Sequence, residues 1–330
     1  MQFLLLLLSF AIILAGAQLF TNAVEWAGHR LSLGEGAVGS LLAAVGTAMP
    51  ETLIPIVAVI GGRQGSEDVA VGAIVGAPFL LATIAMALVG ISALAYRERR
   101  PQGRHLETSA ETLERDLLTF GVFFAAALAL GWGAPEALRA PAAILFLLGY
   151  AVYVRATLRR GGETQDHATL KPLTLDPGDR PTPPGALIVV QLAIGLGAMV
   201  GGAHLFVEEL LTVAEDLGAD ALVLSLVLAP LATELPEKAN SFFWVREGKD
   251  ALALGNITGA MVFQSMVPVA VGLLFTTWEL NRFAALSVVL GLAGGAVAYW
   301  SLHLRGQFNL PAIAAWAGFY GAFLAFVIAS

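Results

Sequence analysis

Two copies of one short motif place hydroxyl and carboxylate side chains inside stretches that are otherwise apolar. The first copy, residues 46–51, reads Gly-Thr-Ala-Met-Pro-Glu, and the second, residues 232–237, reads Ala-Thr-Glu-Leu-Pro-Glu. The Thr and the last Glu of each copy are four residues apart, so on a helix they share one face. Hydroxyl and carboxylate oxygens are hard ligands, which suit Ca2+ better than a transition metal. The motif pair therefore predicts a site for a hard cation.

The second copy contains an extra carboxylate, Glu234, three residues before Glu237. Three carboxylates close together at low dielectric cannot all stay ionised without cations, so the cluster suits exchange of protons for a divalent ion. An alternative is that Glu234 is a helix-start residue or the partner of Lys238, four residues on. The candidate metal ligands are Thr47, Glu51, Thr233, Glu234, Glu237 and Asn256.

A proline beside a glutamate in the middle of an apolar stretch also affects the backbone. Proline removes an amide donor and favours the first turn of a helix, where a carboxylate meets the positive end of the helix dipole. Inside a membrane, this preference predicts a helix broken at mid-depth, with freed carbonyls facing a carboxylate-lined cavity. We therefore expect a break at each Pro-Glu pair.

The composition is that of an integral membrane protein. The chain has 330 residues, of which 57% are hydrophobic and 13% charged, and its mean hydropathy is +0.77. A soluble chain carries about 25% charged residues. Cysteine is absent, which excludes disulfides, thiolate catalysis and cysteine metal sites. No nucleotide or nucleic-acid motif is present, and no cofactor is expected. The predicted partners are inorganic cations and the lipid bilayer. A monomer is compatible with the sequence.

The apolar segments are long enough to cross a bilayer ten times. A polar, proline-rich stretch at 159–184 predicts a cytoplasmic linker between residues 1–158 and 185–330. One gapless shift aligns Thr47, Pro50 and Glu51 with their counterparts in the second motif. Each half contains five of the ten spans. Because five is an odd number, the two halves enter the membrane from opposite sides. The predicted fold is an all-α membrane protein with ten transmembrane helices as two inverted five-helix repeats: 2–25, 36–60, 67–94, 116–132, 140–158, 185–208, 220–245, 249–276, 283–302 and 310–329.

The distribution of basic residues predicts the orientation. The loops that follow the even-numbered spans contain only Arg63, Arg139 and Arg282, whereas the loops after the odd-numbered spans contain most of the other Lys and Arg residues. Because cytoplasmic loops carry the excess of positive charge, the basic face is cytoplasmic and both termini lie outside. This predicts a multi-pass protein of a prokaryotic inner or plasma membrane.

At these motifs the chain resembles the calcium/cation antiporter superfamily, to which the sodium/calcium exchangers belong. The resemblance is strongest over residues 36–80 and 222–265 and extends over nearly the whole chain. It implies a ten-helix inverted repeat in which alternating access moves ions across the membrane. By position, it also implies that the ligands of Ca2+ at the centre are Thr47, Glu51, Thr233 and Glu237.

The sequence departs from the family pattern where Na+ ligands are expected. Ala48 and Glu234 replace the usual serine after each motif threonine, and Ala77 and Ala260 replace further hydroxyls. The chain is therefore predicted to be a secondary active antiporter with Ca2+ as the leading substrate, exchanged for H+ or Na+, with H+ ahead. Mg2+, Mn2+ or a monovalent ion remain alternative substrates. A non-transporting sensor or scaffold and a membrane-embedded enzyme are alternative classes, although the spans lack a nucleophile or His-Glu metal set and we expect no enzyme.

Overall fold

All the regular secondary structure in the described part of the chain is helical. The computed structural model describes residues 2–30, 48–100, 102–159, 171–178, 180 and 182–330, with the backbone alone at 158, 235–237 and 239. Eleven α-helices lie in these residues, with a π-helical turn η2 (Leu81–Ala85) and a 3-10 turn η3 (Glu136–Leu138). The α-helices are α1 (Gln2–Arg30), α4 (Met49–Gly61), α5 (Ser66–Leu80), α6 (Met86–Ala95), α7 (Ala110–Gly131), α8 (Arg139–Arg159), α9 (Gly185–Leu217), α10 (Ala221–Arg246), α11 (Asp250–Phe275), α12 (Arg282–Arg305) and α13 (Leu310–Ile328).

Side chains in the sequence explain where several helices begin and end. The side chains of Asp220 and Asn281 accept hydrogen bonds from the first amides of α10 and α12, as N-capping residues do. Gly218 and Gly306 end α9 and α12 in the left-handed conformation, which glycine adopts without steric cost. The short polar connections therefore separate long apolar helices.

The helices follow the predicted spans closely. Nine predicted spans coincide with described helices, and α5, η2 and α6 form one continuous helix over 66–95. The first part of the span predicted at 36–60 lies outside the described residues, and α4 occupies its second part. Seven helices in the described part of the chain are long and apolar enough to cross a membrane, and α4 and residues 221–234 of α10 are shorter apolar helices.

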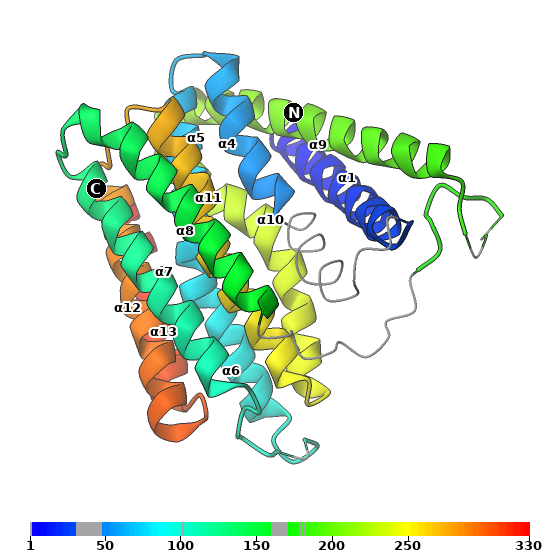
Figure 1. The fold of residues 1–330 in the computed structure, drawn as a ribbon. Helices are drawn as coiled ribbons and strands as arrows, with labels where there is room; N and C mark the ends of the chain where they lie inside the picture. Colours follow the sequence, from blue (N-terminus) through cyan, green and yellow to red (C-terminus); the bar gives the residue numbers. More distant parts are fainter. Residues whose placement is uncertain (1, 31–47, 101, 160–170, 179, 181) are drawn as a thin grey trace.

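Two groups of helices make up the molecule (Figure 1). The helices α1 and α9 pack along each other and extend away from a bundle that contains the other helices. A Cβ atom added to Gly16 of α1 would lie 2.9 Å from the backbone oxygen of Gly195 in α9, so the two backbones come close. Arg63, in the α4–α5 loop, forms an ion pair of 2.6 Å with Glu208 of α9, and this hydrogen bond raises the pKa of the Arg63 guanidinium. The loop is thereby linked to the outlying pair.

Within the bundle, α5 is the central helix. Its residues from Val69 to Leu80 are buried, and it contacts α4, α10, α11 and α12. A Cβ atom at Gly76 would lie 2.2 Å from the backbone oxygen of Leu226 in α10, so only glycine fits there. Pro230 has no amide proton to donate to that oxygen. The close approach of α5 to α10 at Gly76 therefore covers a carbonyl that lacks its helical donor.

The second half does not show the same packing among the described residues. No described heavy atom lies within 4 Å of a Cβ atom added at Gly255 or Gly259 of α11. In the predicted inverted repeat, residues of the second predicted span would face these glycines, and 36–47 of that span lie outside the described residues.

The predicted break at the second Pro-Glu pair is wrong. The helix α10 runs without interruption from Ala221 to Arg246, through Pro236. Proline removes one amide donor, which leaves the Ala232 carbonyl without its usual helical partner. A helix that neighbouring helices hold by packing can continue past such a residue. Here α5, α6 and α11 contact α10.

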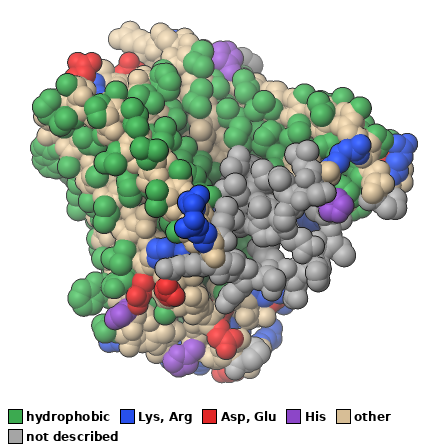
Figure 2. Space-filling model, viewed as in Figure 1, with side chains coloured by type: hydrophobic (Ala, Val, Ile, Leu, Met, Phe, Trp, Pro, Cys, Tyr) green, Lys and Arg blue, Asp and Glu red, His purple; other side chains and the backbone are tan. Residues whose placement is uncertain are grey.

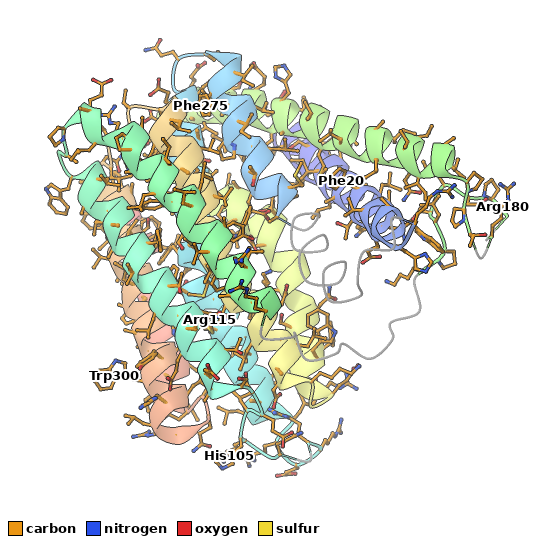
Figure 3. All side chains as sticks on the ribbon, in the orientation of Figure 1. Phe20, His105, Arg115, Arg180, Phe275 and Trp300 are labelled. Atoms are coloured by element: carbon orange, nitrogen blue, oxygen red, sulfur yellow. The ribbon has the colours of Figure 1, made fainter. Side chains whose placement is uncertain are left out.

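The surface fits a protein embedded in a bilayer. Figure 2 shows hydrophobic side chains over the flanks of the helices, with charged side chains in several groups, most of them toward the ends of the helices. Phe275 lies near one end of the bundle and His105 at the opposite end (Figure 3). Large apolar side chains are exposed on α8, among them Ile144, Leu145 and Val152. An apolar surface of this extent is stable in lipid and would aggregate in water.

Candidate cation site

Glu51 lies in the first turn of α4, where the sequence predicted a helix start. The helix begins at Met49 with proline in its first positions, and the Glu51 side chain is buried. The unpaired amides of a helix N-terminus favour a carboxylate at this position. Figure 1 shows this end of α4 at a middle level of the molecule, and α4 contacts α10 and α11. Thr47, the predicted ligand one turn earlier, lies outside the described residues.

Thr233 and Glu234 lie halfway along α10, and both side chains are buried. The Thr233 hydroxyl donates a hydrogen bond of 3.1 Å to the Ala229 carbonyl of its own helix. This bond uses the donor of the hydroxyl and leaves its oxygen lone pairs available to a cation. Thr233 can therefore act as a neutral oxygen ligand without breaking its bond to the helix.

The Glu234 carboxylate has a partner on each oxygen. The amide of Gln264, from α11, donates to Oε1, and the ammonium nitrogen of Lys238 lies 3.3 Å from Oε2. Both charged side chains are 2% exposed. The alternative in which Glu234 is the partner of Lys238 is thus confirmed as a contact.

The structure gives less information on the two remaining predicted ligands, Glu237 and Asn256. Glu237 belongs to α10, but its side chain is outside the description. Asn256 of α11 is half-buried, and its amide donates a hydrogen bond of 3.4 Å to the hydroxyl of Ser241 in α10. Among the described side chains, no group of three or more His, Asp and Glu residues could hold a metal ion. The predicted cluster of three glutamates includes Glu237 and so remains a prediction.

Sequence reasoning missed a second buried polar cluster. The Asp116 carboxylate of α7 accepts hydrogen bonds from Tyr153 of α8 at 2.8 Å and from Thr258 of α11 at 2.9 Å, and Arg115 lies 3.0 Å away. Because Tyr153 and Thr258 reach Asp116 from two other helices, the cluster serves as a polar link between α7, α8 and α11. An aspartate at the edge of an apolar span was the only signal, and its partners are distant in the sequence.

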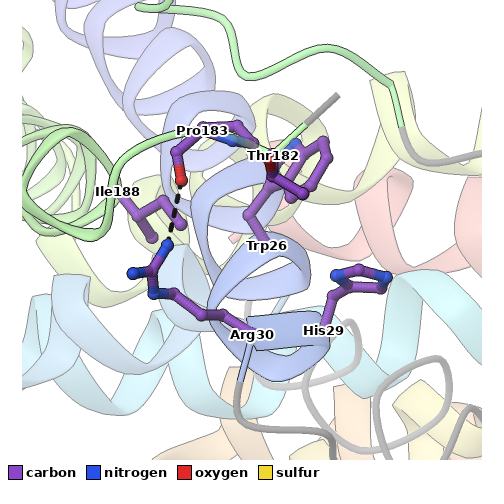
Figure 4. A pocket seen from close by; sticks show the side chains of 6 residues that line it. All are labelled: Trp26, His29, Arg30, Thr182, Pro183 and Ile188. Atoms are coloured by element: carbon purple, nitrogen blue, oxygen red, sulfur yellow. Dashed lines mark hydrogen bonds between the residues drawn. The ribbon is translucent and has the colours of Figure 1, made fainter. Parts of the chain in front are cut away.

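Two pockets in the described residues lie away from these carboxylates. One, of about 220 Å3, lies where α1 ends and α9 begins (Figure 4). There Arg30 donates a hydrogen bond of 3.2 Å to the Pro183 carbonyl. A second, of about 360 Å3, lies between α12 and α13 and is mainly apolar. Neither contains a predicted ligand.

The chain matches the family described as sodium/calcium exchanger protein over residues 1–159 and 187–329. It is 24% identical over 280 residues to the putative antiporter CaxA of Alkalimonas amylolytica, which covers 84% of this chain and 82% of the relative. It is 24% identical over 253 residues to the inner membrane protein YrbG of Escherichia coli strain K12, which covers 75% of this chain and 71% of that protein.

Solved structures with the same fold include one H+-coupled and one Na+-coupled exchanger, the two counterions that the sequence left open. The H+/Ca2+ exchanger CAX superposes with a TM-score of 0.75 at 20% identity, covering 98% of this chain and 82% of that chain. The sodium-calcium exchanger NCX_Mj superposes with a TM-score of 0.59 at 20% identity, covering 98% of this chain and 97% of that chain. The fold is therefore that of these exchangers. With the family match over nearly all of its length, the chain is a multi-pass membrane protein of the sodium/calcium exchanger family, a family of cation antiporters and not of enzymes.

Proposed function

We propose that the protein is a secondary active antiporter that exchanges Ca2+ for H+ or Na+ by alternating access. The observation that carries the proposal is a buried carboxylate, Glu51, in the first turn of a helix that begins at mid-level in an exchanger fold. Burying a carboxylate in an apolar bundle costs free energy, so such a residue indicates a function. Cation transport is such a function. The shared family supports the same conclusion.

The proposed site lies between the two motifs. Its charged ligands are Glu51 and Glu237, with the hydroxyls of Thr47 and Thr233 as neutral ligands, and Glu234 and Asn256 complete it. Carboxylate, hydroxyl and amide oxygens together can meet the six to eight ligands that Ca2+ prefers. The contact between α10 and α11 supports this ligand set, because Thr233, Glu234 and Asn256 belong to these two adjacent helices.

For the architecture, we propose ten spans in two inverted repeats, residues 1–158 and 185–330, joined by a cytoplasmic linker at 159–184. The agreement between nine predicted spans and the described helices supports this arrangement. The excess of basic residues on one face supports a cytoplasmic linker with both termini outside. The inner membrane of a prokaryote is the proposed location, in line with the relative YrbG.

H+ is the counterion that we favour, because alanines stand where hydroxyl ligands for Na+ are expected in both repeats. The wild-type protein, purified and reconstituted into liposomes, should take up radioactive Ca2+ when an outward H+ gradient is imposed. An outward Na+ gradient without a pH difference should drive uptake weakly. Uptake driven by Na+ alone would reject H+ coupling, and silence under both gradients in folded protein would reject Ca2+ exchange. Competition by Mg2+ or Mn2+ in the same assay tests the alternative substrates.

A further inference from the structure

A buried lysine stands next to the proposed cation site. Lys238 lies one turn after Glu234 on α10, and its ammonium nitrogen is 3.3 Å from Glu234 Oε2. Both side chains are 2% exposed. An ammonium ion at this depth in a membrane protein is expensive, and such charges are kept where they pair with a functional group. The position of Lys238 therefore requires a reason beyond packing.

The two members of the pair belong together in the repeat. The gapless shift that aligns the two motifs places Glu234 on Ala48 and Lys238 on Thr52. Ala48 and Thr52 also contact each other, through a hydrogen bond of 3.0 Å from the threonine hydroxyl to the Ala48 carbonyl. The second repeat thus has an acid and a base at two positions that are neutral in the first repeat. Relative to the first motif, the second therefore has both a carboxylate and the cation that pairs with it.

The surroundings of the pair also suit a cation. Gln264 donates its amide to Glu234 Oε1, while its own carbonyl oxygen is buried and has no hydrogen-bond partner in the described part of the chain. A buried oxygen without a donor is costly and is typical of a position that a cation or a water molecule occupies. The carboxylate, the amide oxygen and the ammonium group therefore form a small polar centre between α10 and α11.

We propose that the Lys238 ammonium is a tethered cation, which takes the place of one transported monovalent ion in the cation site. This inference rests on the proposed function. The carboxylates of Glu51, Glu237 and Glu234 together with Lys238 carry a formal charge of minus two, which one divalent cation balances. Without the lysine the charge is minus three, and the site requires an additional monovalent ion. Lys238 thereby determines that Ca2+ binds without a Na+ ion beside it.

Replacing Lys238 by Met tests the proposal without a transport assay. The substitution keeps the length and apolar stem of the side chain and removes its charge. In N-methylglucamine buffer, Lys238→Met should melt at a lower temperature than the wild type, because the buried Glu234 has lost its partner. Adding NaCl should raise its melting temperature by about 5 °C, as expected for an ion that binds only the folded state. The wild type and Lys238→Arg should show a much smaller response to Na+.

The double variant Glu234→Gln with Lys238→Met is the matched control, since it removes both charges. Its response to Na+ should match that of the wild type. A single Lys238→Met variant that responds to Na+ no more than the wild type, or a double variant that responds as strongly as the single one, would overturn the proposal. These outcomes do not depend on transport, whereas absence of Ca2+ uptake by the wild type would count against the proposed function.

If Lys238→Met does not fold in either buffer, the wild type supplies the deciding measurement. A site of charge minus two predicts that Ca2+ exchanges for two positive charges, so no net charge moves. Uptake of Ca2+ driven by an H+ gradient should then be the same with and without a membrane potential set by K+ and valinomycin. Several-fold acceleration by an inside-negative potential would contradict the tethered cation.

Discussion

Glu51→Gln is expected to abolish Ca2+ uptake. Glu51 is buried in the first turn of α4, and in the proposed site its carboxylate is a charged ligand of the transported ion. Losing one partner of a buried charge interaction costs roughly 2–5 kcal/mol, so uptake at low Ca2+ should fall on the order of 100-fold or more. The measurement is the initial rate of radioactive Ca2+ uptake into liposomes over a range of Ca2+ concentrations.

The change should not impair folding, because glutamine has nearly the same shape and removes a buried charge. Glu279→Gln is the matched control, since Glu279 is exposed in the loop before α12. This control should transport at the wild-type rate. A folded Glu51→Gln protein that takes up Ca2+ like the control would show that Glu51 is not a ligand.

The largest effect on stability is expected at a buried ion pair near the His105 end of the bundle. Arg100, in the loop after α6, lies 2.5 Å from Asp250 in the first turn of α11, and both side chains are 0% exposed. Asp250 also accepts a hydrogen bond from the Glu107 amide at 2.9 Å. Asp250→Ala should therefore destabilise the protein by roughly 3–5 kcal/mol, because it leaves the arginine charge buried and unpaired.

Thermal unfolding in detergent measures this effect, and the double variant Arg100→Met with Asp250→Leu provides the comparison. Replacing both charges by apolar groups removes the desolvation cost, so the double variant should be more stable than Asp250→Ala alone. Equal melting temperatures of Asp250→Ala and the wild type would mean that the pair contributes little.

The helices could be predicted from the sequence because their lengths follow from continuous apolar runs. The predicted span 67–94 and the observed 66–95 differ by one residue at each end. The predicted end of α9 at residue 208 was too early, since the helix continues to Leu217. Its last part carries Glu208, Glu215 and Asp216, which resemble a loop in composition but extend a helix that ends only at Gly218.

The site was less predictable, because its contacts join helices that are distant in the sequence. The spacing of Glu234 and Lys238 allowed a pair within α10, but it could not choose between a metal ligand and a lysine partner. Gln264 of α11, which donates to Glu234, becomes visible only when the helices are packed. The continuity of α10 through Pro236 also depends on tertiary packing, whereas proline rules treat one helix at a time.

The most direct test of the central claim is to locate a bound cation. Crystals of the wild type soaked in Sr2+, a heavier analogue of Ca2+, would give an anomalous difference map at the strontium absorption edge. The proposed cation site predicts a peak about 2.3–2.6 Å from carboxylate oxygens of Glu51 and Glu237, the distance range of Ca2+ ligands. A peak bound elsewhere, or none near either motif in protein that transports Ca2+, would contradict it.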